Sequence, residues 1–330
     1  LSATVLQSLN AEEELTALSA LSFNGGLTIG GNANTAVYTN GFDITTAALT
    51  VSAGDLDFTG GGNVIVQADA NFTGGSITKN AASELIFEAG AAQNLTTGAN
   101  DLGNIRVRVD GTQLTIVDSG TFDNVTIDAA ATQPWIGTSQ NQTVNGNWTN
   151  SADATAMNIT GGTVTFGGTA AAVNAAGGAF SGFTVNTTGT VTLGGNLDVN
   201  GALTVTAGTL DADDGSGPSQ INVGPGWSVA GGGAEDFLRD TFKGAFGGSA
   251  PDRTGDATPE DAFYNVTIAA TGDVTLASDI TVERNWDKAA VGSVVDATTN
   301  LATVNFIGTV TSRILGATTF YGFVVPSTAA

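Results

Sequence analysis

The feature that most constrains the fold of this sequence is an internal repeat of roughly 80 residues. The segment FTVNTTGTVTLGGNLDV at 183–199 matches VTIAATGDVTLASDITV at 266–282, and AALTVSAGDLDF at 47–58 matches GALTVTAGTLDA at 201–212. Each element is a short run in which apolar residues alternate with Thr, Asn or Asp, and it ends in Gly, Asn or Asp. This pattern is typical of short β-strands separated by tight turns.

Two architectures explain such a repeat. In a parallel β-solenoid (β-helix), each repeat forms about four turns of about 20 residues. In tandem immunoglobulin-like β-sandwiches, each repeat closes one small domain. The solenoid is favoured because the strands are short, the corners are small residues, and the chain has only six Pro residues, too few for Pro-rich linkers between the copies. We therefore predict an all-β parallel β-solenoid.

The N-terminal segment 1–20 departs from the repeat. Within it, AEEELTALSA at 11–20 predicts a short helix, because Glu residues are favourable in the first turn of a helix. We expect this segment to be an N-terminal cap over the first turn or an assembly arm. The solenoid repeats are expected to start at residue 21 and to continue to residue 229.

A second departure, at 230–263, interrupts the repeats. AEDFLRDTFKGAF predicts a short helix with Leu238 and Phe242 on one face, and a loop follows it. The segment is therefore expected to be a helical and loop insertion. We expect this insertion either to pack against the side of the solenoid or to contact a neighbouring subunit or ligand. The repeats resume over 264–330 and end in an incomplete copy.

The incomplete copy suggests how the chain could assemble. NFIGTVTSRILGATTFYGFVV at 305–325 aligns with TFGGTAAAVNAAGGAFSGFTV at 165–185, which GTVTLGGN follows. No such continuation follows residue 325, but GGLTIGGN at 25–32 resembles it. One hypothesis is that the last turn of one subunit is continued by the first turn of the next, giving a head-to-tail homopolymer. The other is that the chain is a piece of a longer repetitive protein.

Charge and composition exclude several functions. The net charge is −22, so binding to nucleic acid or directly to a membrane surface is not expected. The chain has no Cys and no His, which excludes Ser-His-Asp and Cys-His catalysis and disulfides. No apolar run is long enough to predict a transmembrane segment. We predict no catalytic residues, no bound organic cofactor, and no enzymatic activity.

Several strings resemble the repeats of large bacterial cell-surface proteins: GNWTNS, GGTVTFGG, FTVNTTGTVTLGGNLDVNGALTVTAGTLDA and TTFYGF. These proteins include filamentous-haemagglutinin-like and autotransporter-like β-solenoids. The resemblance covers the chain outside 1–20 and 230–263. It implies a secreted protein exposed at the cell surface, with a role in adhesion or in filament and envelope structure. It brings no catalytic residues with it.

The sequence offers three kinds of candidate site. The acidic run LDADDGSG could hold calcium through Asp211, Asp213 and Asp214, since alternate Asp side chains and a Gly turn suit a hard cation, but a solvated turn is the favoured interpretation. Eight Asn-X-Thr sequences could carry glycans: Asn71, Asn94, Asn124, Asn141, Asn147, Asn158, Asn186 and Asn265. Four tryptophans could stack on sugars, but core packing is the favoured interpretation: Trp135, Trp148, Trp227 and Trp286.

These observations favour a structural subunit of an extracellular filament, tube or surface layer that polymerises head to tail through its solenoid ends. The first alternative is an adhesin passenger or stalk that presents a binding surface. A carbohydrate-active β-helix enzyme is a remote alternative, because such enzymes need clustered carboxylates on one outer face.

Overall fold

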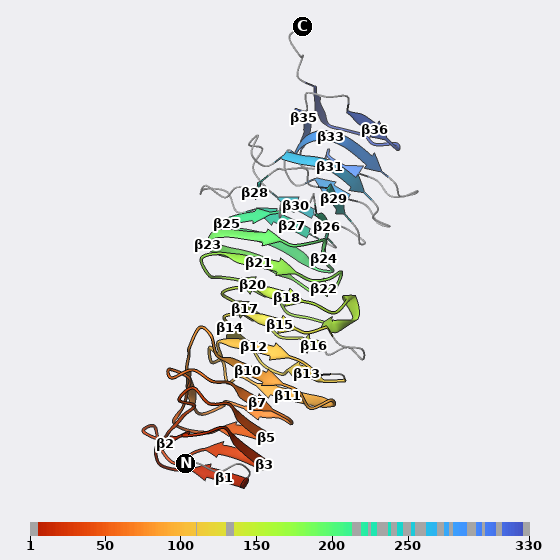
Figure 1. The fold of residues 1–330 in the computed structure, drawn as a ribbon. Coiled ribbons are helices and arrows are strands. Elements are labelled where there is room, and N and C mark those ends of the chain that lie inside the picture. Colours follow the sequence, from red (N-terminus) through yellow and green to blue (C-terminus); the bar gives the residue numbers. More distant parts are fainter. Residues whose placement is uncertain are drawn as a thin grey trace. The chain divides into compact units, whose positions relative to one another are not determined.

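In this computed structural model the described residues are 6–109, 111–129, 135–212, 219–223, 226–229, 237–238, 243–246, 252–254, 262–268, 274–276, 280–288, 295–298, 301–307 and 312–325. The chain divides into two compact units, Leu1–Gly162 and Thr163–Ala330. Each unit is a parallel β-solenoid, in which strands of successive turns lie side by side (Figure 1). The predicted fold class is confirmed.

In the first unit, every described strand pair is parallel, and partners lie one turn apart. Ile105 and Val125, which pair, are 20 residues apart in the chain, as the predicted turn length requires. Strands β1, β3 and β5 each span two faces of a turn. The strands are β1 Leu6–Ala11, β2 Leu15–Thr16, β3 Leu21–Ile29, β4 Ala36–Tyr38, β5 Ile44–Val51, β6 Asp55–Asp57, β7 Val64–Val66, β8 Ala70–Asn71, β9 Ser76–Thr78, β10 Glu84–Phe87, β11 Ala92–Thr96, β12 Asn104–Val107, β13 Gln113–Ile116, β14 Gly120–Phe122, β15 Val125–Ile127, β16 Trp135–Thr138, β17 Gln142–Val144, β18 Trp148–Asn150 and β19 Met157–Ile159.

The second unit has the same plan. Phe183 pairs with Val164 of the turn before it and with Leu203 of the turn after it, all in parallel. The strands are β20 Val164–Phe166, β21 Ala171–Asn174, β22 Ala179–Phe180, β23 Phe183–Leu193, β24 Leu197–Val199, β25 Ala202–Asp211, β26 Gln220–Val223, β27 Gly226–Val229, β28 Phe237–Leu238, β29 Lys243–Phe246, β30 Asp252–Thr254, β31 Ala262–Ile268, β32 Val274–Leu276, β33 Ile280–Lys288, β34 Val295–Asp296, β35 Thr303–Phe306, β36 Arg313–Leu315 and β37 Gly322–Val324.

Alternation along the strands builds the core. In β23, the side chains of Phe183, Val185, Val191 and Leu193 are fully buried, whereas Thr184 between them is only partly buried. Each fully buried Val, Leu or Phe side chain contributes about 1.5–3 kcal/mol relative to an exposed one. Thr suits the outward positions because its β-branched side chain favours the strand and its hydroxyl meets water. The period-2 pattern read from the sequence therefore predicts which residues form the core.

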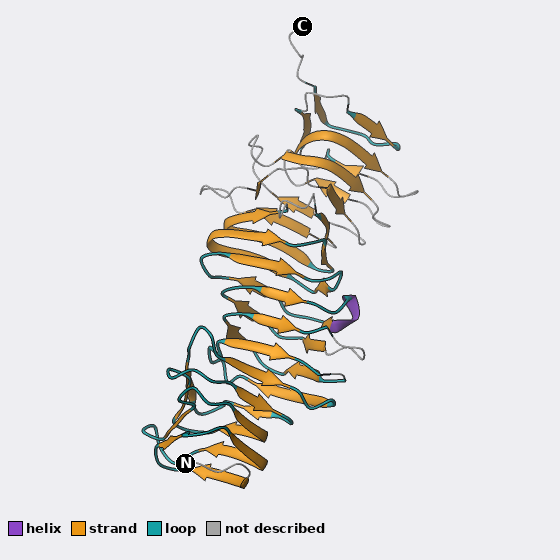
Figure 2. Cartoon of the chain, viewed as in Figure 1, coloured by secondary structure: helices purple, strands orange, loops and turns teal. Residues whose placement is uncertain are grey.

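The predicted helix at 11–20 is wrong. Strand β1 extends to Ala11, which pairs with Ile29, and Leu15 of β2 pairs with Val37. These ladder bonds and the buried positions of Ala11 and Ala17 outweigh the helix propensity of Ala, Glu and Leu. One helix occurs in the described residues, the 3-10 turn Ala154–Ala156, coloured purple in Figure 2.

The predicted helix in the 230–263 insertion is also wrong where the structure describes it. Phe237–Leu238 is strand β28, which pairs with β25, and Lys243–Phe246 is strand β29, which pairs with β26 and β31. The described parts of this segment therefore continue the ladder. Phe242 and the loop that follows Phe246 lie mostly outside the described residues.

Candidate assembly surfaces

The last described turn of the second unit presents an open strand edge. Among the described residues, β36 pairs only with β33 and β37 only with β35. Apolar side chains accompany this edge: Ile314 is 43% exposed and Phe323 is 45% exposed. The neighbouring residues Leu315, Tyr321, Val324 and Val325 are exposed as well. We call β36, β37 and these side chains the C-terminal edge.

An aromatic cluster within the second unit shows what the C-terminal edge lacks. Phe166, Phe180 and Phe183 are each fully buried, and the Phe183 ring lies 4.9 Å from Phe166 and 5.2 Å from Phe180. The turn that follows covers them, because Phe183 pairs with Leu203 of β25.

The same cluster recurs at the C-terminal edge. Phe306, Phe320 and Phe323 lie at the equivalent positions, with 5.3 Å between the Phe323 ring and each of the other two rings. The strand register is also the same, since Val304 pairs with Phe323 as Val164 pairs with Phe183. The two clusters differ in what covers them. Among the described residues, β37 pairs with β35 on one side, and no strand pairs with it on the opposite side. The edge is therefore an aromatic core with one side uncovered.

The first turn of the first unit has an edge of a different character. Among the described residues, β1 pairs only with β3 and β2 only with β4. The corner between these strands carries three exposed acidic residues, Glu12, Glu13 and Glu14. With Asn32, Asn34 and Thr35 they line a polar hollow. We call β1, β2 and this corner the N-terminal edge.

Segment 25–32, which the sequence matches to the missing continuation of the last repeat, is not part of this edge. Leu27 of β3 pairs with Leu9 of β1 on one side and with Leu49 of β5 on the other. Both of its neighbours are already supplied by its own chain. Segment 25–32 therefore cannot itself complete the last turn of another copy. The strand available for pairing at this end of the first unit is β1.

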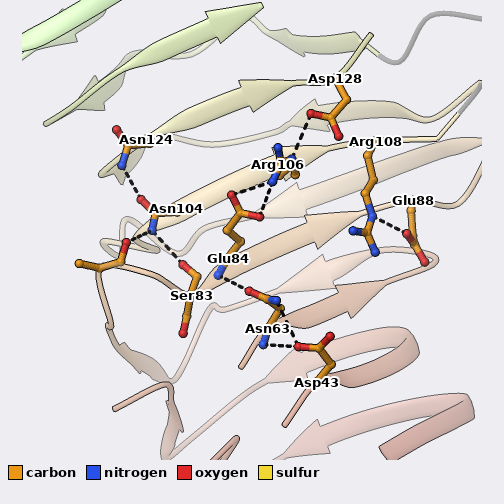
Figure 3. Close-up of polar contacts among 11 residues, drawn as sticks. Asp43, Asn63, Ser83, Glu84, Glu88, Asn104, Arg106, Arg108, Asn124 and Asp128 are labelled. Atoms are coloured by element: carbon orange, nitrogen blue, oxygen red, sulfur yellow. Dashed lines mark hydrogen bonds and ion pairs between the residues drawn. The ribbon is translucent and has the colours of Figure 1, made fainter. Parts of the chain in front are cut away.

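A ladder of polar side chains runs along one corner of the first unit (Figure 3). Asn63 donates its backbone and side-chain N–H groups to Asp43 Oδ1 at 2.9 and 3.1 Å, and its own Oδ1 accepts from the Glu84 N–H. Asn124 Nδ2 donates to Asn104 Oδ1 at 2.7 Å. Each bond joins one turn to the next, so the ladder fixes the height and register of the stack.

Ion pairs flank this ladder. Arg106 bridges Glu84 at 2.9 Å and Asp128 at 3.1 Å, and Arg108 pairs with Glu88 at 2.7 Å (Figure 3). Burial lowers the pKa of Arg106, but its hydrogen bonds to Glu84 and Asp128 together raise it above the usual range. Sequence reasoning missed these pairs. The signal was the spacing of 20 to 22 residues between partners, which equals one turn.

Lys79 of the first unit contacts two carboxylates at once. Its Nζ lies 2.6 Å from Asp101 Oδ2 and 2.9 Å from Asp123 Oδ1, on two successive turns. Burial lowers the pKa of Lys79, but hydrogen bonds and charges from both carboxylates outweigh that effect, so the pKa is raised above 10.5. The ion pairs of Lys79 therefore stabilise the folded state fully below pH 10.5. This stabilisation is lost as the pH rises through the raised pKa of Lys79.

We expect Lys79→Met to lower the unfolding free energy of the first unit by about 1–2 kcal/mol, since it leaves two carboxylates side by side and these groups are about one-third exposed. Arg108→Met is the matched control, because it removes a single ion pair and is expected to cost about 0.5 kcal/mol. Urea unfolding followed by circular dichroism measures both. Equal losses would show that the second carboxylate contributes nothing.

The structure separates the candidate sites proposed from the sequence. Asp211 lies at the end of β25 and is partly buried, whereas Asp213 and Asp214 lie outside the described residues. Calcium binding by these three residues stays a prediction, and a melting temperature insensitive to chelator would count against it. In the described part of the chain, no three acidic residues are grouped to hold a metal ion.

The tryptophans do not form a sugar-stacking platform where they are described. Trp148 and Trp286 are buried, and Trp286 Nε1 donates to Thr318 Oγ1 at 3.1 Å. The side chains of Trp135 and Trp227 lie outside the description. The interpretation of Trp148 and Trp286 as core residues is confirmed.

The sequon asparagines differ in access. Asn124 is half-buried in the polar ladder, so a glycan there would break a bond between turns. Glycosylation stays a prediction for the exposed ones, and added mass in the intact protein would reveal it: Asn94, Asn141, Asn147, Asn158 and Asn186.

Comparison of the chain with protein-family models, with curated proteins and with solved structures gives no match. The resemblance to bacterial cell-surface repeats therefore rests on the repeat pattern. Within the described residues, no helix is long and apolar enough to cross a bilayer. The features that remain for a functional argument are the two open edges.

Proposed function

We propose that the chain is a structural subunit of an extracellular filament, tube or surface layer, and that it polymerises head to tail through the ends of its solenoid. The observation that carries this proposal is the uncovered aromatic cluster of the C-terminal edge. Its counterpart inside the same unit is fully buried by a following parallel turn. A second copy of the chain can supply such a turn, because its solenoid consists of parallel strands with the same spacing.

The energetic argument follows from exposed apolar area. Exposed, unpaired strand edges with apolar side chains are templates for association, and large apolar patches on a protein surface mark interaction sites. The C-terminal edge combines both. Its surroundings do not oppose docking by charge, since Arg313 is the only charged residue in 297–330. An extracellular location accords with the acidic surface and with the resemblance to cell-surface repeats.

Assembly is expected to depend on the apolar side chains of the C-terminal edge. We expect the wild-type chain to form linear polymers that negative-stain electron microscopy resolves. The double variant Ile314→Glu/Phe323→Glu should remain monomeric at the same concentration. The free-energy cost of burying two unpaired carboxylates at the junction exceeds the free energy gained from the remaining apolar contacts.

Val117→Glu is the matched control. Val117 is 42% exposed, but it follows β13 within the first unit and belongs to neither edge. This variant should polymerise as the wild type does. Single, unassociated wild-type particles at all concentrations tested would refute the proposed function.

A further inference from the structure

We infer that the surface that receives the C-terminal edge is the N-terminal edge of a second copy, with β1 and β2 stacking in parallel on the open strands of the preceding subunit. This inference rests on the proposed function and specifies its junction. It replaces segment 25–32, whose strand β3 is paired on both sides within its own chain, with β1, which has a partner on one side only among the described residues.

Strand direction sets the polarity of the junction. Every described ladder in both units is parallel, as in the pairs of β1 with β3 and of β35 with β37. Placing the C-terminal edge on the N-terminal edge continues a parallel ladder. Bringing together two C-terminal edges through a two-fold axis would instead create antiparallel pairs. The continued ladder is the arrangement that both units already use.

The backbone of β1 is arranged to accept a neighbour. The Gly30 N–H donates to the Ala11 carbonyl at 2.9 Å, so the backbone polar groups of Ala11, and of Leu9 two residues earlier, face β3. In a parallel strand the alternate residues face the other way. The N–H and C=O groups of Ser8 and Asn10 therefore point toward the free side of β1.

Charge opposes the competing junction between two N-terminal edges. The first 78 residues contain seven Asp and Glu residues and no Lys or Arg, and three of the acids form the corner at Glu12–Glu14. Two such edges would repel each other. The segment 297–330 carries a single charge, which is positive at Arg313. Charge complementarity therefore favours pairing of the unlike edges.

Mixing two blocked variants tests the junction. The N-edge variant is Ser8→Pro/Asn10→Pro, which removes two N–H donors on the free side of β1 and none that bonds β3; Pro is tolerated on an edge strand in this orientation. The C-edge variant is Ile314→Glu/Phe323→Glu. Each should be monomeric alone, with the circular dichroism spectrum of the folded chain. The C-edge variant should melt somewhat below the wild-type monomer, because Phe323 contacts Phe306 and Phe320. An equimolar mixture should form a dimer of twice the 32.8 kDa monomer mass, measured by light scattering after size exclusion.

The other outcomes are also decisive. An N-edge variant that forms dimers alone would show that two C-terminal edges meet, and one that still polymerises would show that β1 is not the acceptor. Either result overturns this inference while leaving self-assembly intact. A wild-type chain that never associates overturns the proposed function itself.

Labelling gives a second measurement that does not depend on proline substitutions. The chain has no cysteine, so Asn10→Cys and Val117→Cys each introduce a single thiol at an exposed position. Polymerisation should slow maleimide labelling of Asn10→Cys at least tenfold and leave Val117→Cys unchanged. Equal labelling rates for both in the polymer would refute the N-terminal edge as the acceptor.

Discussion

Replacing Phe183 with alanine is expected to lower the unfolding free energy of the second unit by about 3–5 kcal/mol, the usual cost of removing a buried Phe ring. Phe183 is fully buried and contacts both Phe166 and Phe180. It also pairs with strands of the turns before and after it. The cavity would therefore lie between turns, where little can move to fill it.

Phe323→Ala is the matched control for this prediction. Phe323 has two aromatic neighbours at the equivalent positions, Phe306 and Phe320, and the same strand register, but it is 45% exposed. We expect the unfolding free energy of the unassembled chain to fall by about 1–2 kcal/mol. The loss is smaller than at Phe183 because roughly half of the Phe323 side chain stays in contact with water when the chain folds. The measurement is urea unfolding combined with hydrogen exchange, since stacked turns need not unfold as a single unit.

The comparison bears on assembly. If Phe323 becomes buried in a polymer, Phe323→Ala should cost more in the polymer than in the monomer, whereas Phe183→Ala should cost the same in both. Hydrogen exchange of the assembled and unassembled chain distinguishes these cases. Equal losses for the two substitutions in the monomer would contradict the difference in burial on which the C-terminal edge is defined.

The fold class could be predicted from the sequence because local pattern and long-range structure agree in most turns. In β23 the alternation of apolar residues and Thr fixes both the strand and its inward face. Where they disagree, tertiary contacts decide. AEEELTALSA favours a helix by composition, yet Ala11 and Leu15 lie in ladders with β3 and β4. A short segment beside an open strand edge gains more from pairing than from one or two helical turns.

The candidate site could be predicted only in part. The repeat alignment located the incomplete turn at 303–325, but which strand is free at the other end depends on the pairing of β1 with β3, which has no repeat signature. The ion pairs of Arg106 and Arg108 span one turn and had a signal in their spacing, but the pair of Lys79 with Asp123 had none. Lys79 and Asp123 lie 44 residues apart, and only a known register of two full turns brings them together.

The second large effect is expected at a corner of the first unit. Gly54 has φ +77°, and a Cβ at this position would lie 2.2 Å from the Thr35 carbonyl oxygen of the preceding turn. That same oxygen accepts a hydrogen bond from Asp55 N–H at 2.9 Å. Gly54→Ala therefore combines backbone strain with a backbone clash, and we expect a loss of roughly 2–5 kcal/mol.

Gly61→Ala separates the two causes. Gly61 has φ +85°, but the nearest atom to its Cβ position is the Gly41 Cα at 3.8 Å, an ordinary contact. Only the conformational strain remains, so the expected loss is about 1–2 kcal/mol by urea unfolding. If both variants lost the same amount, the close approach at Gly54 would have no energetic role. A larger loss at Gly54 would mean that glycine is required there because consecutive turns touch, backbone against backbone, at the spacing that any added subunit must also match.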